Sequence, residues 1–581
     1  MRYKSQLYDV PKIASVQKML LNSAKNYGSK LAIEDLNKTP INKLTYNELL
    51  DHVLRFGNAL QNLGYKEKSH IAVIGENRVQ WAIAYLTGMA FNMVVVPIDR
   101  NLTDNEVLNI VHESDSECVI FSGNYTDLFA DKRTSLKRIK HYICLDETTE
   151  ENLLEMKTLI SETEPFAKEN LPEINNSEMA EIIFTSGSLG RAKGVMLSQG
   201  NIVANLIDMV SMLMMYPEDR FLSVLPMHHT YECTCGMLCP LYAGSSVHYA
   251  RSLKTITDDL QKINATIILG VPLLYDKMFK RISKSIEDDK VKSKVVPVLR
   301  KVTNVTEKLG FGGLKKKVFK ELHRRFGGSL RIFIAGGAAP DPLVAKGLRE
   351  FGFNFLQGYG LTETSPILAL NRLDQFKDNA AGLPLPSVEL KINNPDADGI
   401  GEIYAKAPNV MLGYYKNEKA TEEAFENEWF KTGDIGLIDK DGFLHINGRQ
   451  KNVIISNSGK NVFPEEIEDI LNRSPFILES AVYGEENDKH DEVIAAQIVV
   501  DAEAFIKLSE TEDIKIDDAL IKKYIAIEVK AVNKQLAGYK QIKKYYIREN
   551  EFEKTTTQKI KRHLIKKWFT FQQSQFEQFQ K

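Results

Sequence analysis

Short runs of aliphatic and β-branched residues alternate with longer segments of helical spacing through the first three quarters of the chain. Six such runs are bounded by turn residues and predict buried strands: HIAVIG, MVVVPI, CVIFSG, EIIFT, ATIILGV and LRIFIAG. Between them, residues 46–64 and 103–114 have the apolar spacing of helices, and Thr103 is placed as the N-cap of the second. This alternation predicts a large α/β unit in which helices cover a mostly parallel sheet.

The pattern changes after about residue 450. Five segments there predict a compact α+β unit of roughly 130 residues, an ordinary domain size: 464–472, 479–484, 492–500, 521–536 and 543–548. A chain of 581 residues also exceeds the length at which a single core keeps growing. We therefore expect at least two domains.

Composition excludes several classes of protein. The chain is 43% apolar with a formal net charge of -2, which gives no overall attraction to nucleic acid. Its first residues, MRYKSQLYDVPK, lack the apolar core of a secretory signal, and no apolar run approaches the ~20 residues that span a bilayer. Five sparse cysteines favour a reducing compartment, and the cluster CTCGMLC favours buried thiols over a zinc site. These observations predict a cytoplasmic, multidomain protein.

One segment departs from this electrostatic balance. Residues 277–325 contain 16 Lys and Arg against 5 Asp and Glu, an excess of 11. A solvated pair of helices explains the excess. The alternative is peripheral contact with anionic lipid at the inner face of a membrane, where each basic residue contributes ~1 kcal/mol. An acidic carrier protein fits the same charge.

The stretch TSGSLGRAKG, residues 185–194, follows the strand EIIFT. It lacks the Gly-Lys-Ser/Thr of the common nucleotide P-loop. A glycine-rich loop after a strand nevertheless exposes backbone N–H groups that ring a phosphate, and here Ser186, Ser188 and Lys193 add hydroxyls and a cation. The alternative is a flexible surface turn.

Two further stretches carry polar groups suited to a nucleotide. In GYGLTETSP, Tyr359 offers an aromatic face and Glu363 a carboxylate suited to a hard divalent cation. Asp434, in a TGD turn, has a carboxylate that can accept both ribose hydroxyls, and Arg449 follows in NGR. Taken singly, the aspartate fits ordinary turn chemistry and the arginine fits a surface donor.

Taken in order, seven stretches resemble the adenylate-forming superfamily, which includes acyl-CoA synthetases, luciferases and peptide-synthetase adenylation domains: TSGSLGRAKG, LPMHHTYE, AGGAAP, GYGLTE, TGD, NGRQK and EKTTTQKIKR. The resemblance runs from about Leu44 to the motif TQKIKR, nearly the whole chain. GENRVQW, LPMHHTYE and ISNSGKNVFPEEIE are similar to long-chain fatty-acid CoA ligases in particular.

The resemblance implies a role for each matching residue. The ATP β- and γ-phosphates would be held by Thr185, Ser186, Gly187, Ser188, Gly190 and Lys193. The adenine would be framed by Gly336, Gly337, Ala338, Tyr359 and Gly360. Thr362 and Glu363 would contact the α-phosphate and Mg²⁺, Asp434 the ribose, and Arg449 the nucleotide, while Lys559 would stabilise the first half-reaction.

The same resemblance implies the architecture. We expect an α/β fold with a large N-terminal domain of mixed sheets flanked by helices, residues 1–448, and a small mobile α+β C-terminal domain, residues 453–581. The hinge, residues 449–452, would centre on Lys451. Rotation of the small domain would then bring Ser458 and Gly459 to the CoA side of the site.

The implied reaction joins a fatty acid, ATP and coenzyme A. Acyl-AMP and pyrophosphate form first, and CoA then takes the acyl group and releases AMP. The pocket would include His229, Thr230 and Gly236, although His229 also fits a packed core histidine. The stretch LPMHHTYECTCGMLCPLY has no Asp to pair with an amine, which favours a plain carboxylic acid.

Three departures from the family pattern leave alternatives open. The phosphate loop has Leu189 where Thr is usual and Ala192 where Pro is usual, and Gln558 precedes the catalytic lysine where Gly is usual. A lost hydroxyl costs ~1.5–3 kcal/mol if it bonded a charged group, so slower turnover is expected rather than loss. The alternatives are a ligase that uses another thiol acceptor, such as a carrier protein, and a weakly active acyl- or nucleotide-binding relative. Chain-length preference and oligomeric state are not predicted.

Overall fold

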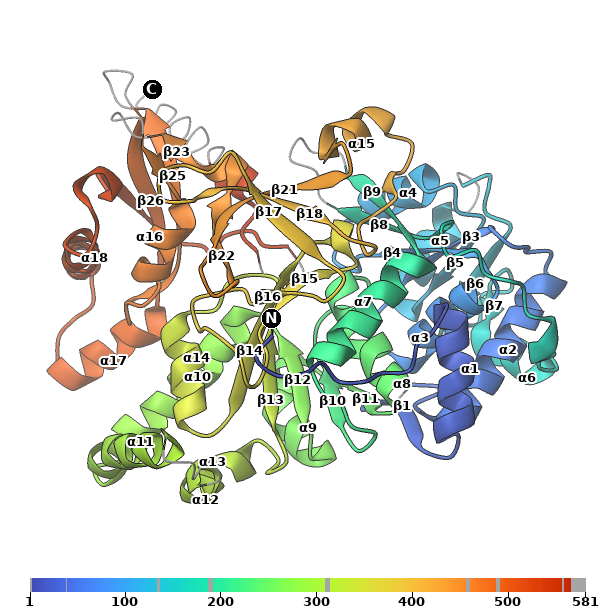
Figure 1. Cartoon of the computed structure of the whole chain (residues 1–581), viewed down its shortest axis with the longest axis horizontal. Helices are drawn as coiled ribbons and strands as arrows, with labels where there is room; N and C mark the ends of the chain where they lie inside the picture. Colours follow the sequence, from blue (N-terminus) through green and yellow to red (C-terminus); the bar gives the residue numbers. More distant parts are fainter. Residues whose placement is uncertain are drawn as a thin grey trace. The chain divides into compact units, whose positions relative to one another are not determined.

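The computed structural model describes residues 3–37, 39–132, 136–185, 192–308, 314–455, 460–486, 492–555 and 559–565. The chain folds into two compact units (Figure 1). Unit 1 comprises Met1–Leu390, Ala405–Phe430 and Lys440–Leu444, and unit 2 comprises Lys391–Tyr404, Lys431–Asp439 and His445–Lys581. Within the described residues, no helix is both long enough and apolar enough to cross a membrane.

Unit 1 contains a nine-stranded sheet of order β16-β15-β14-β13-β12-β10-β11-β1-β2. Its strands are β1 (Leu31–Asp35), β2 (Lys43–Thr45), β10 (Arg220–Ser223), β11 (Ser246–Tyr249), β12 (Ile267–Gly270), β13 (Ile332–Ala335), β14 (Asn354–Gly360), β15 (Ile367–Leu370) and β16 (Leu383–Pro384). Strands β1, β11, β10, β12, β13 and β14 run parallel to their neighbours in this order. Their carboxyl ends therefore share one edge of the sheet.

A second sheet in unit 1 has eight strands in the order β19-β9-β8-β4-β3-β5-β6-β7. Its strands are β3 (His70–Ile74), β4 (Val94–Ile98), β5 (Cys118–Phe121), β6 (His141–Cys144), β7 (Leu154–Glu155), β8 (Met179–Thr185), β9 (Lys193–Ser198) and β19 (Gly413–Tyr414). Strands β4, β3 and β5 are parallel, whereas β8 and β9 form an antiparallel pair.

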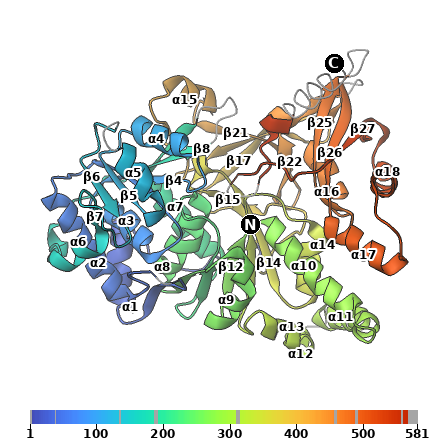
Figure 2. The ribbon, with the colours of Figure 1, turned by 180° about the vertical axis from the view of Figure 1, so that it is seen from behind.

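Helices bury both faces of both sheets. One layer of helices packs against strand residues of both sheets in a shared core. It contains α1 (Val16–Tyr27), α2 (Tyr46–Asn62), α3 (Val79–Ala90), α6 (Met156–Glu162), α7 (Gln199–Met212) and α8 (Cys239–Ala243). The other face of the nine-stranded sheet packs on α9 (Ile256–Ile263), α10 (Pro272–Glu287), α13 (Lys320–Arg325) and α14 (Pro342–Glu350), seen from behind in Figure 2. The other face of the eight-stranded sheet packs on α4 (Asp104–Glu113) and α5 (Thr126–Lys132).

Burial on two faces explains the unbroken apolar runs of the sequence. Along β13, Ile332 and Ile334 enter the layer shared by the two sheets, whereas Phe333 and Ala335 enter the opposite layer. A strand whose successive side chains enter two opposite cores must have an apolar residue at every position. The six predicted strands and both predicted helices are confirmed, and Thr103 caps α4 with a capping box that includes Glu106.

A third sheet has the order β17-β18-β21-β20, with β22 paired to β21. Its strands are β17 (Glu389–Asn393), β18 (Gly401–Lys406), β20 (Phe425–Glu426), β21 (Trp429–Ile438) and β22 (Leu444–Arg449), and α15 (Glu418–Ala424) precedes β20. Sequence reasoning did not predict these strands, which are short or alternate apolar and polar residues.

The core of unit 2 is a three-stranded sheet covered by helices. Its strands are β25 (Ile477–Glu486), β26 (Glu492–Val500) and β27 (Lys544–Arg548), and its helices are α16 (Pro464–Leu471), α17 (Ala502–Glu512) and α18 (Asp518–Asn533). A short pair, β23 (Ile454–Ile455) and β24 (Asn461–Val462), precedes α16. The predicted α/β fold with a small α+β unit near the carboxyl terminus is confirmed.

Candidate active site

Three predicted site segments of unit 1 begin at the carboxyl edge of the nine-stranded sheet. The segment after β10 carries His229 and Thr230, the segment after β13 begins at Gly336, and Glu363 follows β14. Two contacts hold these segments against neighbouring strands: the Tyr231 hydroxyl donates to the carbonyl of Ile334 on β13 over 3.3 Å, and Gly336 N donates to the carbonyl of Gly270 at the end of β12 over 3.2 Å. The carboxyl edge of parallel strands is where α/β proteins bind ligands.

Two glycines of this edge are required by backbone geometry. A Cβ at position 360 would collide with the Pro366 carbonyl oxygen, so only glycine fits where β14 turns toward Glu363. Gly337 has a φ of 84°, a conformation that disfavours other residues. Gly337 and Ala338 are exposed, whereas Tyr359 is half-buried against the core. The predicted adenine frame therefore has exposed backbone beside a fixed aromatic ring.

The predicted phosphate loop joins two paired strands. Thr185 ends β8 and Lys193 begins β9, and the two residues are partners in the antiparallel register. The Thr185 hydroxyl also lies 3.5 Å from the Lys193 carbonyl oxygen. Both ends of the loop are thus fixed by the sheet. The remaining predicted residues of the loop, Ser186, Gly187, Ser188 and Gly190, lie outside the described residues.

A single tyrosine joins the predicted phosphate lysine to the predicted metal carboxylate. The Tyr414 hydroxyl donates to Glu363 Oε1 over 3.0 Å, and Lys193 Nζ lies 4.7 Å from the centroid of the same ring. The main chain supports this arrangement, because Met411 N donates to the Glu363 carbonyl over 2.8 Å. Lys193 and Glu363 are 170 positions apart in the sequence, and the fold brings them to two sides of one side chain. Thr362 begins the short helix η5 (Thr362–Thr364) that contains Glu363.

The histidine pair after β10 meets an aspartate from the other sheet of unit 1. The rings of His228 and His229 lie 4.1 Å apart, and His228 Nε2 lies 3.5 Å from Asp99 Oδ1. One ligand-type atom from each of the three residues lies within 4.8 Å of the others. His228 is buried, whereas His229 is half-buried, so His229 keeps access to solvent that a core histidine would lack.

The segment after the histidines is a π-helix, η3 (Tyr231–Leu238), and Thr230 is the buried residue before it. The predicted pocket residue Gly236 lies against Glu232, because a Cβ there would be 2.5 Å from Glu232 Oε1. Glu232 is fully buried, and burial raises the pKa of its carboxyl to about 8. The three cysteines of this segment, Cys233, Cys235 and Cys239, are buried free thiols, as predicted.

In unit 2 the predicted ribose and nucleotide residues form an ion pair. Arg449 Nε lies 2.8 Å from Asp434 Oδ1, and Arg449 Nη1 donates to the Thr432 carbonyl over 3.3 Å. Asp434 N in turn donates to the Thr432 hydroxyl over 3.1 Å. Asp434 as a whole residue is 4% exposed, so burial and the ion pair with Arg449 fix the orientation of its carboxylate.

The predicted hinge and catalytic lysines also belong to unit 2. Lys451 is exposed on the short helix η6 (Gln450–Asn452), directly after Arg449 and β22. Lys559 is exposed, and two hydrogen bonds join its main chain to Thr555: Thr555 N donates to the Lys559 carbonyl over 2.8 Å, and Lys559 N donates to Thr555 Oγ1 over 3.2 Å. Ser458 and Gly459 lie outside the described residues.

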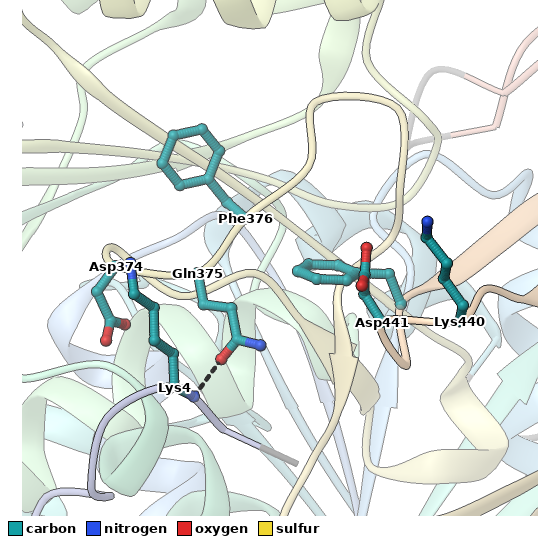
Figure 3. A pocket seen from close by; sticks show the side chains of 7 residues that line it. Lys4, Asp374, Gln375, Phe376, Lys440 and Asp441 are labelled. Carbon is teal, nitrogen blue, oxygen red and sulfur yellow. Dashed lines mark hydrogen bonds between the residues drawn. The ribbon is translucent and has the colours of Figure 1, made fainter. Parts of the chain in front are cut away.

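A surface hollow of roughly 560 Å³ lies elsewhere in unit 1 (Figure 3). It is lined by Lys4, Asp374, Gln375, Phe376, Lys440, Asp441 and Phe443. None of the predicted site residues lines it. Its two lysines and two aspartates balance, so the hollow offers no net charge to a nucleotide.

Sequence reasoning did not identify Tyr414 or Asp99 as parts of the site. Tyr414 lies 51 positions after Glu363 in the unremarkable stretch LGYYKN, and Asp99 lies 129 positions before His228. Both contacts join segments that are distant in the sequence: Tyr414 lies on β19, which pairs with β9, and Asp99 follows β4 of the second sheet while His228 follows β10 of the first. No local pattern marks either residue.

An α/β fold whose glycine and carboxylate segments gather at one sheet edge is typical of enzymes that bind nucleotides. The chain belongs to the AMP-binding enzyme family, whose model matches residues 20–415, and the model of the AMP-binding enzyme C-terminal domain matches residues 466–559.

Several known proteins are similar over most of their length. A long-chain-fatty-acid–CoA ligase of Mycobacterium bovis is 27% identical over 557 residues, 90% of this chain and 91% of that protein. A chloroplastic long-chain-fatty-acid–[acyl-carrier-protein] ligase of Arabidopsis thaliana is 27% identical over 81% of this chain and 75% of that protein. Among solved structures, ATP-bound MatB of Rhodopseudomonas palustris has a TM-score of 0.76 at 23% identity, covering 96% of this chain and 99% of its own. This last likeness establishes the shared fold.

Proposed function

We propose that the chain activates a fatty acid with ATP, forming acyl-AMP and pyrophosphate, and then transfers the acyl group to the thiol of coenzyme A with release of AMP. The observation that carries the proposal is the group Lys193, Tyr414 and Glu363, which holds a cation and a carboxylate at the end of the glycine-rich hairpin. The fatty-acid ligase relatives support the choice of substrate.

The first half-reaction brings two anions together, since a carboxylate must approach the α-phosphate of ATP. In this scheme Lys193 balances charge on the β- and γ-phosphates. Glu363 fits Mg²⁺, because a carboxylate with one oxygen held by Tyr414 is a fixed hard ligand. Bound Mg²⁺ would supply further charge neutralisation at the phosphates. Such preorganised charges stabilise a transition state more than they do in bulk water.

Unit 2 contributes the remaining roles. Asp434, oriented by Arg449, accepts hydrogen bonds from the ribose hydroxyls. Lys559 neutralises charge that develops at the α-phosphate during adenylation. We place the domain boundary at residues 449–452 with Lys451 as the hinge residue, so that residues 453–581 move between the two half-reactions, a known class of gating step. Ser458 and Gly459 then face the CoA arm.

The acyl group is assigned to the apolar segment after β10. Residues of η3 and α8 there are mostly buried, and Glu232 is the one acidic residue among them, with a pKa that burial raises to about 8. Pairing Glu232 with an ammonium group would require charging it against this cost of burial, so the surroundings favour an alkyl chain, which gains ~0.8 kcal/mol per buried CH₂. His229 and Thr230 lie at the entry to this segment.

The experiment is a product analysis. The purified chain is incubated with Mg·ATP and a series of fatty acids of increasing length, with and without CoA, and AMP, pyrophosphate and thioester are measured. AMP and acyl-CoA in equal amounts for one band of chain lengths support the proposal. If acyl-AMP accumulates in the presence of CoA but is consumed when a carrier-protein thiol is added, the acceptor is the carrier protein and not CoA. That is the activity named for the Arabidopsis relative. Absence of pyrophosphate release with every acid would reject the proposed adenylation.

A further inference from the structure

The helix α11 (Lys292–Lys308), together with Val291 directly before it, carries a stripe of exposed valines. The exposed fractions are 69% for Val291, 45% for Val295, 59% for Val298, 50% for Val302 and 59% for Val305. Valine is among the residue types most often buried. A contiguous exposed apolar stripe rimmed by polar residues marks an interaction site. We call these five residues the valine seam.

The opposite side of α11 anchors the helix to unit 1. Val296 and Leu299 pack against the core beneath the nine-stranded sheet, and Thr303 is 1% exposed. Arg300 pairs with Glu350 of α14, and its guanidinium lies 5.0 Å from the centroid of the Phe351 ring. The valine seam therefore faces outward on a helix whose orientation is fixed. Figures 1 and 2 both show α11 beside α12 (Leu314–Val318) at one edge of this unit.

The spacing of the valine seam is that of a coiled coil. Its positions are separated by four, three, four and three residues, which places valine at successive d, a, d, a and d positions of a heptad. The seam extends about 21 Å along the helix, at 1.5 Å per residue. Lys294 and Lys301 occupy the flanking g positions and are exposed. Pro297 lies within the helix at a c position, away from the seam.

We propose that α11 is the docking site for an acidic amphipathic helix of a partner protein. The partner helix would place aliphatic residues against the valine seam and carboxylates against Lys294 and Lys301, the positions that set partner choice in coiled coils. The surroundings extend the positive surface, since Lys316 and Lys317 of α12 and Arg324 of α13 are also exposed. This surface is independent of the adenylation chemistry proposed above.

Charge and side-chain type favour this occupant over two others. A second copy of α11 offers no carboxylate at its e and g positions: an antiparallel pair sets lysine against lysine, and a parallel pair sets Lys294 and Lys301 against Leu299 and Thr306. A lipid surface matches the charge, but helices that lie in a membrane interface use Trp, Phe and Leu on the buried side. Short β-branched residues in strict heptad spacing are instead a feature of helix pairing.

The test uses the full chain and two fluorescent three-heptad peptides. Both peptides have isoleucine at their a and d positions, one with glutamate and the other with lysine at every e and g position, so that neither pairs with itself. We expect the full chain to raise the anisotropy of the glutamate peptide with an affinity at least tenfold higher than for the lysine peptide. Equal affinity for the two peptides would overturn the proposal.

Two double variants separate the apolar component of the surface from the charged component, and a third double variant is the control. The pair Val298→Ser and Val302→Ser should weaken binding of the glutamate peptide at least tenfold, and the pair Lys294→Glu and Lys301→Glu should reverse the preference between peptides. All four side chains are exposed, so adenylation activity should remain and serves as the folding control. The matched control pair, Ile506→Ser and Ile527→Ser, changes isoleucines that are 55% and 51% exposed in unit 2 and should leave binding unchanged.

Two results would contradict the proposed partner. If the serine pair binds the glutamate peptide as the unaltered chain does, attraction is electrostatic only and the valine seam is not a docking site. If vesicles of phosphatidylcholine and phosphatidylserine bind the chain while the glutamate peptide does not, the basic segment 277–325 serves a lipid surface instead.

Discussion

The hydroxyl of Tyr414 is a sharp test of the candidate site. It donates to Glu363 Oε1 over 3.0 Å, while its ring supports Lys193. Tyr414→Phe removes the hydroxyl and keeps the ring. A hydrogen bond to a charged group contributes ~1.5–3 kcal/mol, and each 1.36 kcal/mol changes a rate about tenfold. Because Glu363 is half-buried, we expect a loss near the lower end, about tenfold, in the rate of acyl-AMP formation.

The neighbouring residue supplies a matched control. The Tyr415 hydroxyl donates to Asp115 Oδ2 over 2.7 Å, so Tyr415→Phe breaks the same type of bond one position along the chain. Pyrophosphate release is measured for both variants over a range of Mg²⁺ concentrations. Tyr414→Phe should need more Mg²⁺ and run slower, whereas Tyr415→Phe should retain the rate. Equal rates in the two variants, or equal losses, would refute the role given to Tyr414.

Three further predictions concern the other lysines and a buried acid. Lys559→Ala should abolish acyl-AMP formation but spare thioester formation from supplied acyl-AMP; equal loss of both steps would reject its assigned role. Lys451→Pro should slow the overall reaction and leave adenylation nearly intact, and normal turnover would place the hinge elsewhere. Burial raises the folded-state pKa of Glu232 from 4.5 to about 8. The contribution of Glu232 to the free energy of unfolding is therefore greatest below pH 4.5 and falls as the pH rises toward 8. Glu232→Gln cannot ionise and should lose less stability between pH 6 and pH 8.5 in urea titrations; parallel losses would mean that Glu232 is ionised in the folded state.

The strands were predictable from the sequence because burial on two faces leaves a local signature. In β13, a residue on either face meets a core, so the run LRIFIAG is apolar throughout. Helix α4 was predictable for a similar reason, since Thr103 and Glu106 form its capping box within four residues. In both elements the physical cause lies within one short segment.

The site residues that come from distant pairing were not predictable in this way. Tyr414 lies near Lys193 because β19 pairs with β9, and its segment reaches Glu363 through the bond from Met411 N to the Glu363 carbonyl. Nothing in LGYYKN distinguishes Tyr414 from Tyr415. The valine seam illustrates the same limit. The sequence shows heptad spacing in α11, but a core face and an outward face have the same pattern until the packing of Val296 and Leu299 decides between them.

The most direct test of the central claim follows the oxygen atoms of the fatty acid. The chain is supplied with Mg·ATP, CoA and a fatty acid whose carboxylate oxygens are ¹⁸O, and AMP is analysed by mass spectrometry. Attack of the carboxylate on the α-phosphate predicts one ¹⁸O atom in each AMP formed. Label in inorganic phosphate, with ADP as the other product, would show attack on the γ-phosphate and contradict the proposed adenylation.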